Sequence, residues 1–269
     1  MPTMTESTIH ANGIDIHYWR AGERGAPPLL CLHGLTDSGR CWETFATDLA
    51  GGYDLIMPDA RGHGRSGQPA HGYRTEDRVA DALALLDALG IGQTLVIGHS
   101  MGGDQAAMLG AIAPERVRAA ILEDPAFRHG ENDWLPDTAD GWVTGLLAEQ
   151  ELGYTKLVEQ ARRDRPHWDE RCLDAWAEAK QQCSPLAFNW LREPRTPWGE
   201  YVAKIAVPTL VITAETARGA IIDVATEATL VRLSPHIQVT RFADAGHCVR
   251  YEQPAAFVAA AQAFFDEHR

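Results

Sequence analysis

Compact apolar runs alternate with longer amphipathic stretches through the first half of the chain. The apolar runs are Pro28–Leu32, Asp54–Met57, Thr94–Ile97 and Val117–Leu122, and the amphipathic stretches are Thr75–Leu89 and Met101–Ala113. Continuous apolar runs are typical of parallel strands buried on both faces, whereas apolar residues at helical spacing indicate helices. Ahead of them, Ile14–Trp19 alternates apolar and polar residues after an Asn-Gly turn, which predicts a hairpin. The pattern predicts an α/β fold with a mostly parallel sheet flanked by helices.

This alternation stops after Asp124. Residues 127–198 contain no strand-like run and show helical patterns over Ala139–Glu151, Tyr154–Arg163 and Asp169–Gln182. Strand and helix patterns then resume with Val207–Thr213, Ile221–Leu233, Ile237–Phe242 and Pro254–His268. We interpret residues 127–198 as a helical cap, or lid, inserted after the sixth strand of a core formed by residues 1–126 and 199–269.

Tryptophan is concentrated in the expected cap. Six of the eight tryptophans of the chain lie there: Trp134, Trp142, Trp168, Trp176, Trp190 and Trp198. Indole rings fill hydrophobic cores, and they also line small-molecule pockets. So many of them in one segment indicate that some face a cavity.

Charge and cysteine content narrow the possible partners. The chain has 24 basic and 37 acidic residues, a formal charge of −13, which disfavours nucleic acid and anionic membranes. No apolar stretch approaches the roughly 20 residues of a membrane span, and the start of the chain lacks a signal-peptide pattern. The five cysteines form no close pair, which is typical of reduced thiols. We expect a cytoplasmic protein acting on a small molecule, with neither nucleic acid nor membrane as a partner.

The clearest chemical signal is Gly98-His99-Ser100-Met101-Gly102, which follows one predicted strand and precedes a helix. A serine hydroxyl becomes a useful nucleophile when it is exposed on a sharp turn beside a base and oxyanion donors. The flanking glycines are needed because the turn brings backbone segments very close together. Ser100 is therefore the expected nucleophile.

Two other loops supply the remaining groups. His33-Gly34-Leu35 follows the strand Pro28–Leu32, so that the Leu35 N–H can join the Met101 N–H in an oxyanion hole. Ala245-Gly246-His247 lies after the last predicted strand, where this fold carries its histidine base. His247 is therefore the expected base.

These motifs, together with Asp59–Ser66, resemble the α/β-hydrolase superfamily over nearly the whole chain. In that superfamily the segment matching Asp59–Ser66 mainly braces the loop beside the nucleophile. The ending Leu-Glu-Asp-Pro at 122–125 and Arg-Gly-Ala-Ile at 218–221 are similar to the small-molecule amide hydrolases that include N-formylmaleamate deformylase. The resemblance implies an ester, lactone or amide hydrolase.

The acid of the triad is the one departure from the commonest pattern. The usual aspartate position, after the strand Val207–Thr213, is occupied by Ala217. A second group in the superfamily carries its acid after the preceding strand, where this chain has Asp124. We therefore expect the triad Ser100, Asp124 and His247. Glu215, Asp223 and Asp244 remain the alternative acids.

The predicted function is a serine hydrolase that forms an acyl-enzyme on Ser100 and needs neither a metal nor an organic cofactor. A carbon–carbon bond hydrolase and a non-catalytic ligand-binding homologue are the alternatives. The residues expected to line the substrate pocket are His99, Phe127, His129, Trp134 and Trp190.

Overall fold

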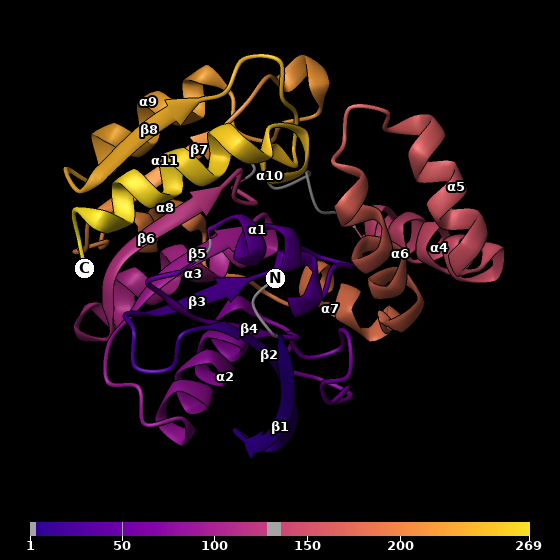
Figure 1. The fold of residues 1–269 in the computed structure, drawn as a ribbon, viewed down its shortest axis with the longest axis horizontal. Coiled ribbons are helices and arrows are strands. Elements are labelled where there is room, and N and C mark those ends of the chain that lie inside the picture. Colours follow the sequence, from indigo (N-terminus) through magenta and orange to yellow (C-terminus); the bar gives the residue numbers. More distant parts are fainter. Residues whose placement is uncertain (1–3, 50, 128–135) are drawn as a thin grey trace.

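An eight-stranded sheet forms the centre of the molecule (Figure 1). The computed structural model describes residues 4–49, 51–127 and 136–269. The strands are β1 (Thr5–Ala11), β2 (Ile14–Gly22), β3 (Pro28–Leu32), β4 (Asp54–Pro58), β5 (Thr94–His99), β6 (Val117–Glu123), β7 (Thr209–Thr213) and β8 (Ile237–Arg241). Their order is β1-β2-β4-β3-β5-β6-β7-β8. Only the pairings β1–β2 and β2–β4 are antiparallel, so the predicted mostly parallel sheet is confirmed.

The register of β5 and β6 determines where the chemistry gathers. His99 at the end of β5 pairs with Glu123 at the end of β6. The residues that follow, Ser100 and Asp124, therefore leave the sheet at neighbouring points of the same edge. In parallel sheets this carboxyl edge is where ligand sites form.

Helices cover both faces of the sheet. They are α1 (Glu43–Asp48), α2 (Thr75–Ala88), α3 (Met101–Ile112), α8 (Trp198–Val202), α9 (Val224–Leu233), α10 (Val249–Glu252) and α11 (Pro254–Asp266). Short 3₁₀ turns are η1 (Gly39–Trp42), η2 (Pro114–Arg116), η3 (Glu170–Cys172), η4 (Pro185–Phe188) and η5 (Thr216–Arg218). One core cluster packs α2, α3 and α9 against the sheet, and a second packs α1 and α11 against it.

The predicted helix Ile221–Leu233 is wrong in its first turn. Helix α9 begins at Val224, because the Asp223 side chain accepts a hydrogen bond from Thr226 N at 2.7 Å and caps it. The amides of Ile221 and Ile222 donate instead to the carboxylate of Asp124. A contact far along the chain thus overrides the local helical pattern.

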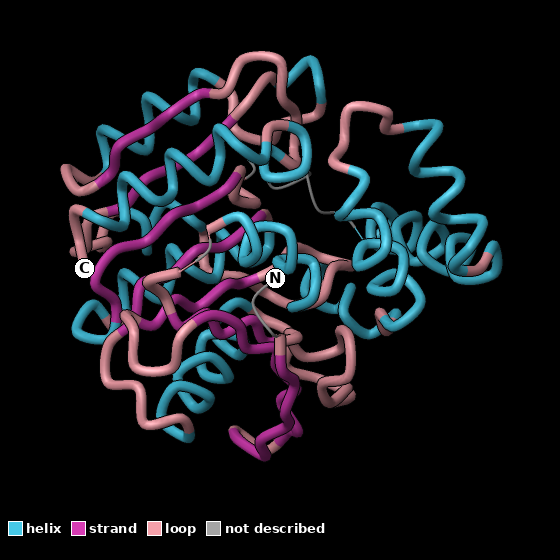
Figure 2. The backbone as a smooth tube through the Cα atoms, in the orientation of Figure 1, coloured by secondary structure: helices cyan, strands magenta, loops and turns pink. Residues whose placement is uncertain are grey.

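Helices α4 (Pro136–Leu152), α5 (Tyr154–Asp164), α6 (Leu173–Gln182) and α7 (Asn189–Arg192) lie between β6 and β7 in the chain. We call residues 136–192 the helical insertion. Figure 1 shows it at the side of the sheet to which the parallel strands point, and Figure 2 shows helices and loops there, without strands in its described residues. Phe188 and Trp190 of the insertion pack in one cluster with Tyr73 and Met101 of the core. Among the described helices, none is long and apolar enough to cross a membrane.

Candidate active site

Ser100 occupies a strained turn between β5 and α3. Its backbone angles are φ 52° and ψ −112°, and its N–H donates to Glu123 O at 2.9 Å. A Cβ at Gly98 would lie 2.1 Å from Gly102 O, and one at Gly102 would lie 2.2 Å from Leu32 O. Only glycine fits at either position, as a sharp strand-to-helix turn requires.

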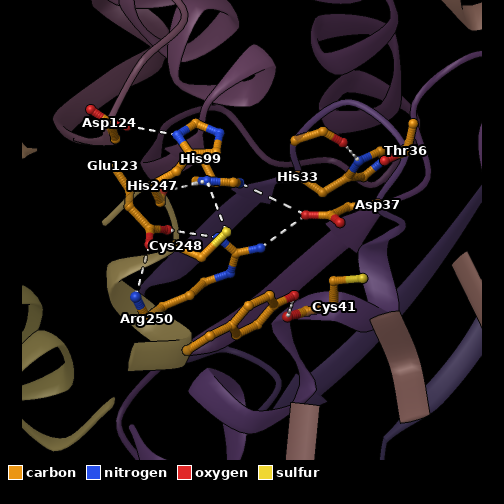
Figure 3. Close-up of polar contacts among 12 residues, drawn as sticks. His33, Thr36, Asp37, Cys41, His99, Glu123, Asp124, His247, Cys248 and Arg250 are labelled. Carbon is orange, nitrogen blue, oxygen red and sulfur yellow. Dashed lines mark hydrogen bonds and ion pairs between the residues drawn. The ribbon is translucent and has the colours of Figure 1, made fainter. Parts of the chain in front are cut away.

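Asp124 and His247 are joined by a short hydrogen bond. His247 Nδ1 lies 2.6 Å from Asp124 Oδ2 (Figure 3). The carboxylate also accepts Ile221 N at 2.8 Å and Ile222 N at 3.0 Å, and its residue is fully buried. Because an ionised carboxylate only accepts, the imidazole proton lies on Nδ1 and leaves Nε2 as a free base.

The other candidate acids are occupied elsewhere. Asp223 caps α9, and the exposed Asp244 lies 3.6 Å from Arg218. Glu215 precedes η5 and is partly exposed. Among the carboxylates of the described residues, only Asp124 forms a hydrogen bond or ion pair with His247.

A cavity of about 610 Å³ opens at this edge of the sheet. Ser100, His247 and Leu35 line it from the core, and Trp176 and Trp190 line it from the helical insertion. Such a volume suits a small organic ligand. Within the described chain no hydrogen bond joins the Ser100 hydroxyl to His247, and such catalytic contacts commonly tighten only when substrate binds.

The residues expected to contact substrate divide into three groups. His99 and Trp190 line the cavity. Phe127 does not: it is buried in the core, where it stacks on Trp198 with centroids 5.2 Å apart. His129 and Trp134 lie outside the described residues. Phe127 belongs to the core because Trp198 and Tyr201 of α8 pack against its ring.

Two backbone amides are available as oxyanion donors. Within the described part of the chain, neither Leu35 N–H nor Met101 N–H donates a hydrogen bond. Gly34 lets the Leu35 loop pass against His99, since a Cβ there would lie 2.7 Å from His99 Nδ1. Both amides flank Ser100, one in the next residue and the other in the neighbouring loop.

Two side chains brace the loop that carries Leu35: His33, from the motif His33-Gly34-Leu35, and Asp59, from the segment Asp59–Ser66. His33 Nε2 accepts from Ala60 N at 2.9 Å, which leaves the proton on Nδ1 to reach Gly34 O at 2.8 Å. Burial lowers the pKa of His33 and favours this neutral form. Asp59 accepts from Gly39 N at 2.7 Å. These contacts agree with a bracing role for both motifs.

The sequence reasoning missed the charged side chains behind His247. Asp37, Arg250 and Glu123 are buried together there, and Figure 3 shows their contacts. No local pattern marks them, because their partners lie far apart in the sequence. The described residues contain no group of three or more His, Cys, Asp or Glu side chains placed to hold a metal ion.

Comparisons with known proteins give the family to which this fold belongs. The model of the α/β-hydrolase fold matches residues 27–254, so this chain belongs to that family. Lipase LipV of Mycobacterium tuberculosis is 32% identical over 223 residues, 81% of this chain and 78% of the lipase. N-formylmaleamate deformylase of Pseudomonas putida is 28% identical over 263 residues, 96% of this chain and 95% of the deformylase. The crystal structure of the enol-lactonase from Burkholderia xenovorans shares the fold, with TM-score 0.79 and 24% identity over 97% of this chain and all of the enol-lactonase.

Proposed function

We propose that this protein is a serine hydrolase that cleaves a carboxylic ester, lactone or amide bond of a small organic molecule. The observation that carries the proposal is the 2.6 Å contact between His247 and Asp124, formed at the cavity that Ser100 also lines. A nucleophile on a strained turn, a base and a buried acid that orients the base make up the catalytic constellation of acyl transfer.

In this mechanism Ser100 Oγ attacks the substrate carbonyl while His247 Nε2 takes the hydroxyl proton. Asp124 holds the ring in the required tautomer and stabilises the imidazolium that forms. The N–H groups of Leu35 and Met101 receive the oxyanion of the tetrahedral intermediate. His247 then returns the proton to the leaving alcohol or amine, and water activated by the same ring releases the acyl group.

The cavity and the relatives support a small substrate. Aromatic side chains of the helical insertion, among them Trp176 and Trp190, line the same cavity as Ser100, so the insertion acts as the lid that selects substrate. One relative is a lipase and the other a deformylase of N-formylmaleamate. Ester and amide cleavage use the same triad, and the proposal therefore covers both.

Replacement of the nucleophile tests the proposal. Ser100→Ala should lower kcat by roughly 10³-fold or more on p-nitrophenyl butyrate, because water cannot replace the hydroxyl at that point. The matched control is Ser7→Ala, which alters an exposed serine on β1. A fluorophosphonate should add one mass increment to the wild type and none to Ser100→Ala. A panel of short esters, lactones, N-acyl compounds and β-diketones then defines the preferred bond.

Three outcomes would contradict the proposal. Near-wild-type hydrolysis by Ser100→Ala would exclude Ser100 as nucleophile. Tight ligand binding without turnover of any panel member would indicate a ligand-binding homologue. Turnover confined to β-diketones would indicate a carbon–carbon bond hydrolase.

A further inference from the structure

A line of buried charged side chains runs from the helical insertion to the back of the candidate site. Its members are Lys180 on α6, Asp37 in the loop after β3, Arg250 on α10 and Glu123 at the end of β6. We call these four residues the buried charge line. None is more than 6% exposed, and the two positive charges balance the two negative ones. Figure 3 shows its core part.

The contacts along the line are continuous. Lys180 Nζ lies 3.4 Å from Asp37 Oδ1, and Arg250 Nη2 donates to Asp37 Oδ2 at 2.9 Å. Arg250 Nη1 donates to Glu123 Oε2 at 3.0 Å, and its backbone N–H donates to Oε1 at 2.8 Å. The guanidinium also lies 4.1 Å from the ring centroid of Tyr251. Asp37 and Arg250 are thus each held between two partners from different segments of the chain.

The line reaches three loops of the candidate site, those that carry Leu35, Asp124 and His247. Arg250 lies on α10, which begins two residues after His247, and Glu123 directly precedes Asp124. Asp37 lies in the same loop as Leu35. Lys180 Nζ also donates to Thr36 Oγ1 at 2.6 Å and to Thr36 O at 3.1 Å in that loop. One side chain of the helical insertion therefore holds the loop that carries an oxyanion amide.

His99 connects the line to the base. His99 Nε2 lies 3.0 Å from His247 O, and because a carbonyl only accepts, Nε2 carries the proton. Its Nδ1 faces Asp37 Oδ2 at 3.8 Å, and the His99 and His247 ring centroids are 4.6 Å apart. Burial and then Arg250 lower the pKa of His99 to about 3, so the ring stays neutral. The backbone of His247 thus rests on a ring that is packed against the aspartate of the line.

Asp37 is ionised in this setting. Burial alone favours the neutral acid, but the positive charges of Lys180 and Arg250 hold the pKa of Asp37 well below its ordinary value. Moving α6 away would leave a buried carboxylate short of one partner, which is strongly unfavourable. The position of α6 and the geometry of the Asp37 loop are therefore coupled.

We propose that Lys180 and Asp37 are positioning residues, which hold the His247 loop and the Leu35 loop in reacting geometry when α6 is seated over the cavity. The proposal rests on the proposed function, in which His247 is the base. The contact between α6 and the core therefore has two effects. It shapes the pocket, and it completes the alignment of the triad when the helical insertion closes.

The test is a set of variants of the full chain, assayed with p-nitrophenyl butyrate as substrate. Lys180→Met should lower kcat on the order of 10- to 100-fold while KM changes by less than about threefold, because misplaced groups slow the reaction more than they weaken binding. Lys180→Arg should restore most of the loss. Lys180→Met/Asp37→Asn, which removes both charges, should be faster than Lys180→Met alone by about fivefold or more. Lys156→Met, on the exposed face of α5, is the matched control and should leave kcat unchanged.

The outcomes separate this proposal from the proposed function. Rates are normalised to fluorophosphonate-titrated sites, so loss of folded protein does not count as loss of kcat. If Lys180→Met does not fold, Lys180→Gln, which keeps a donor for Thr36, takes its place. A wild-type kcat in the variant, or a loss confined to KM, would overturn the positioning role while leaving the serine mechanism intact. Failure of Ser100 to be labelled in the wild type would instead reject the proposed function itself.

Discussion

The assignment of Asp124 as the triad acid is tested by Asp124→Asn. The carboxylate accepts from His247 Nδ1 at 2.6 Å and from Ile221 N at 2.8 Å through Oδ2. Through Oδ1 it accepts from Ile222 N at 3.0 Å and from Ile221 N at 3.1 Å. An asparagine has the same shape, but one of these oxygens becomes an NH₂ group that can only donate.

The two orientations of the amide differ in energy. If its oxygen replaces Oδ2, the NH₂ meets two backbone N–H groups, those of Ile221 and Ile222. If its oxygen replaces Oδ1, the NH₂ meets only one and donates to His247 Nδ1. One unsatisfied buried donor is worth about 1–3 kcal/mol, so the second orientation is favoured by roughly 5- to 150-fold. The histidine proton then sits on Nε2, and the ring cannot accept the Ser100 proton.

Loss of the negative charge beside the imidazolium adds to this tautomer effect. We expect Asp124→Asn to lower kcat on the order of 10²- to 10⁴-fold. Glu215→Gln is the control and should change kcat by less than about tenfold, since that side chain makes no contact with His247 in the described chain. Both variants are compared on one ester, with the folded fraction checked by circular dichroism. A large loss of kcat in Glu215→Gln, together with a nearly normal kcat in Asp124→Asn, would refute the assignment.

Two further predictions concern pH and metals. His99, whose pKa burial and Arg250 lower to about 3, stays neutral in the folded chain, whereas the unfolded chain binds a proton near pH 6.5. Its contribution to stability is therefore full above about pH 6.5 and declines as pH falls toward 3, by at most about 1.4 kcal/mol per pH unit. Urea unfolding between pH 5 and 7 should show a shallower slope for His99→Gln, and equal slopes would contradict this reasoning. EDTA should leave turnover unchanged, because the described residues include no cluster placed to bind a metal ion. Activity lost in EDTA and restored by zinc would argue against the serine mechanism.

Features that depend on neighbouring residues were readable from the sequence alone. Apolar runs such as Thr94–Ile97 predicted buried strands because a strand covered on both faces has no polar side. The glycines around Ser100 predicted a sharp turn between strand and helix, and the structure shows that a Cβ at Gly98 would collide with backbone. The order of strands and helices indicated the α/β class. In each case the responsible forces act within a few residues.

Features that depend on contacts across the sheet were decided by the tertiary structure. Asp124 differs from the other candidate acids because amides far along the chain bind its carboxylate and His247 reaches it. The same contacts keep Ile221 and Ile222 out of the predicted helix, which begins only at Val224. Phe127 is a core residue because of where α8 packs, and the pairing of Asp37 with Arg250 joins loops 213 residues apart. A sequence pattern reports local periodicity and backbone preference, whereas the order of strands in the sheet decides which loops meet.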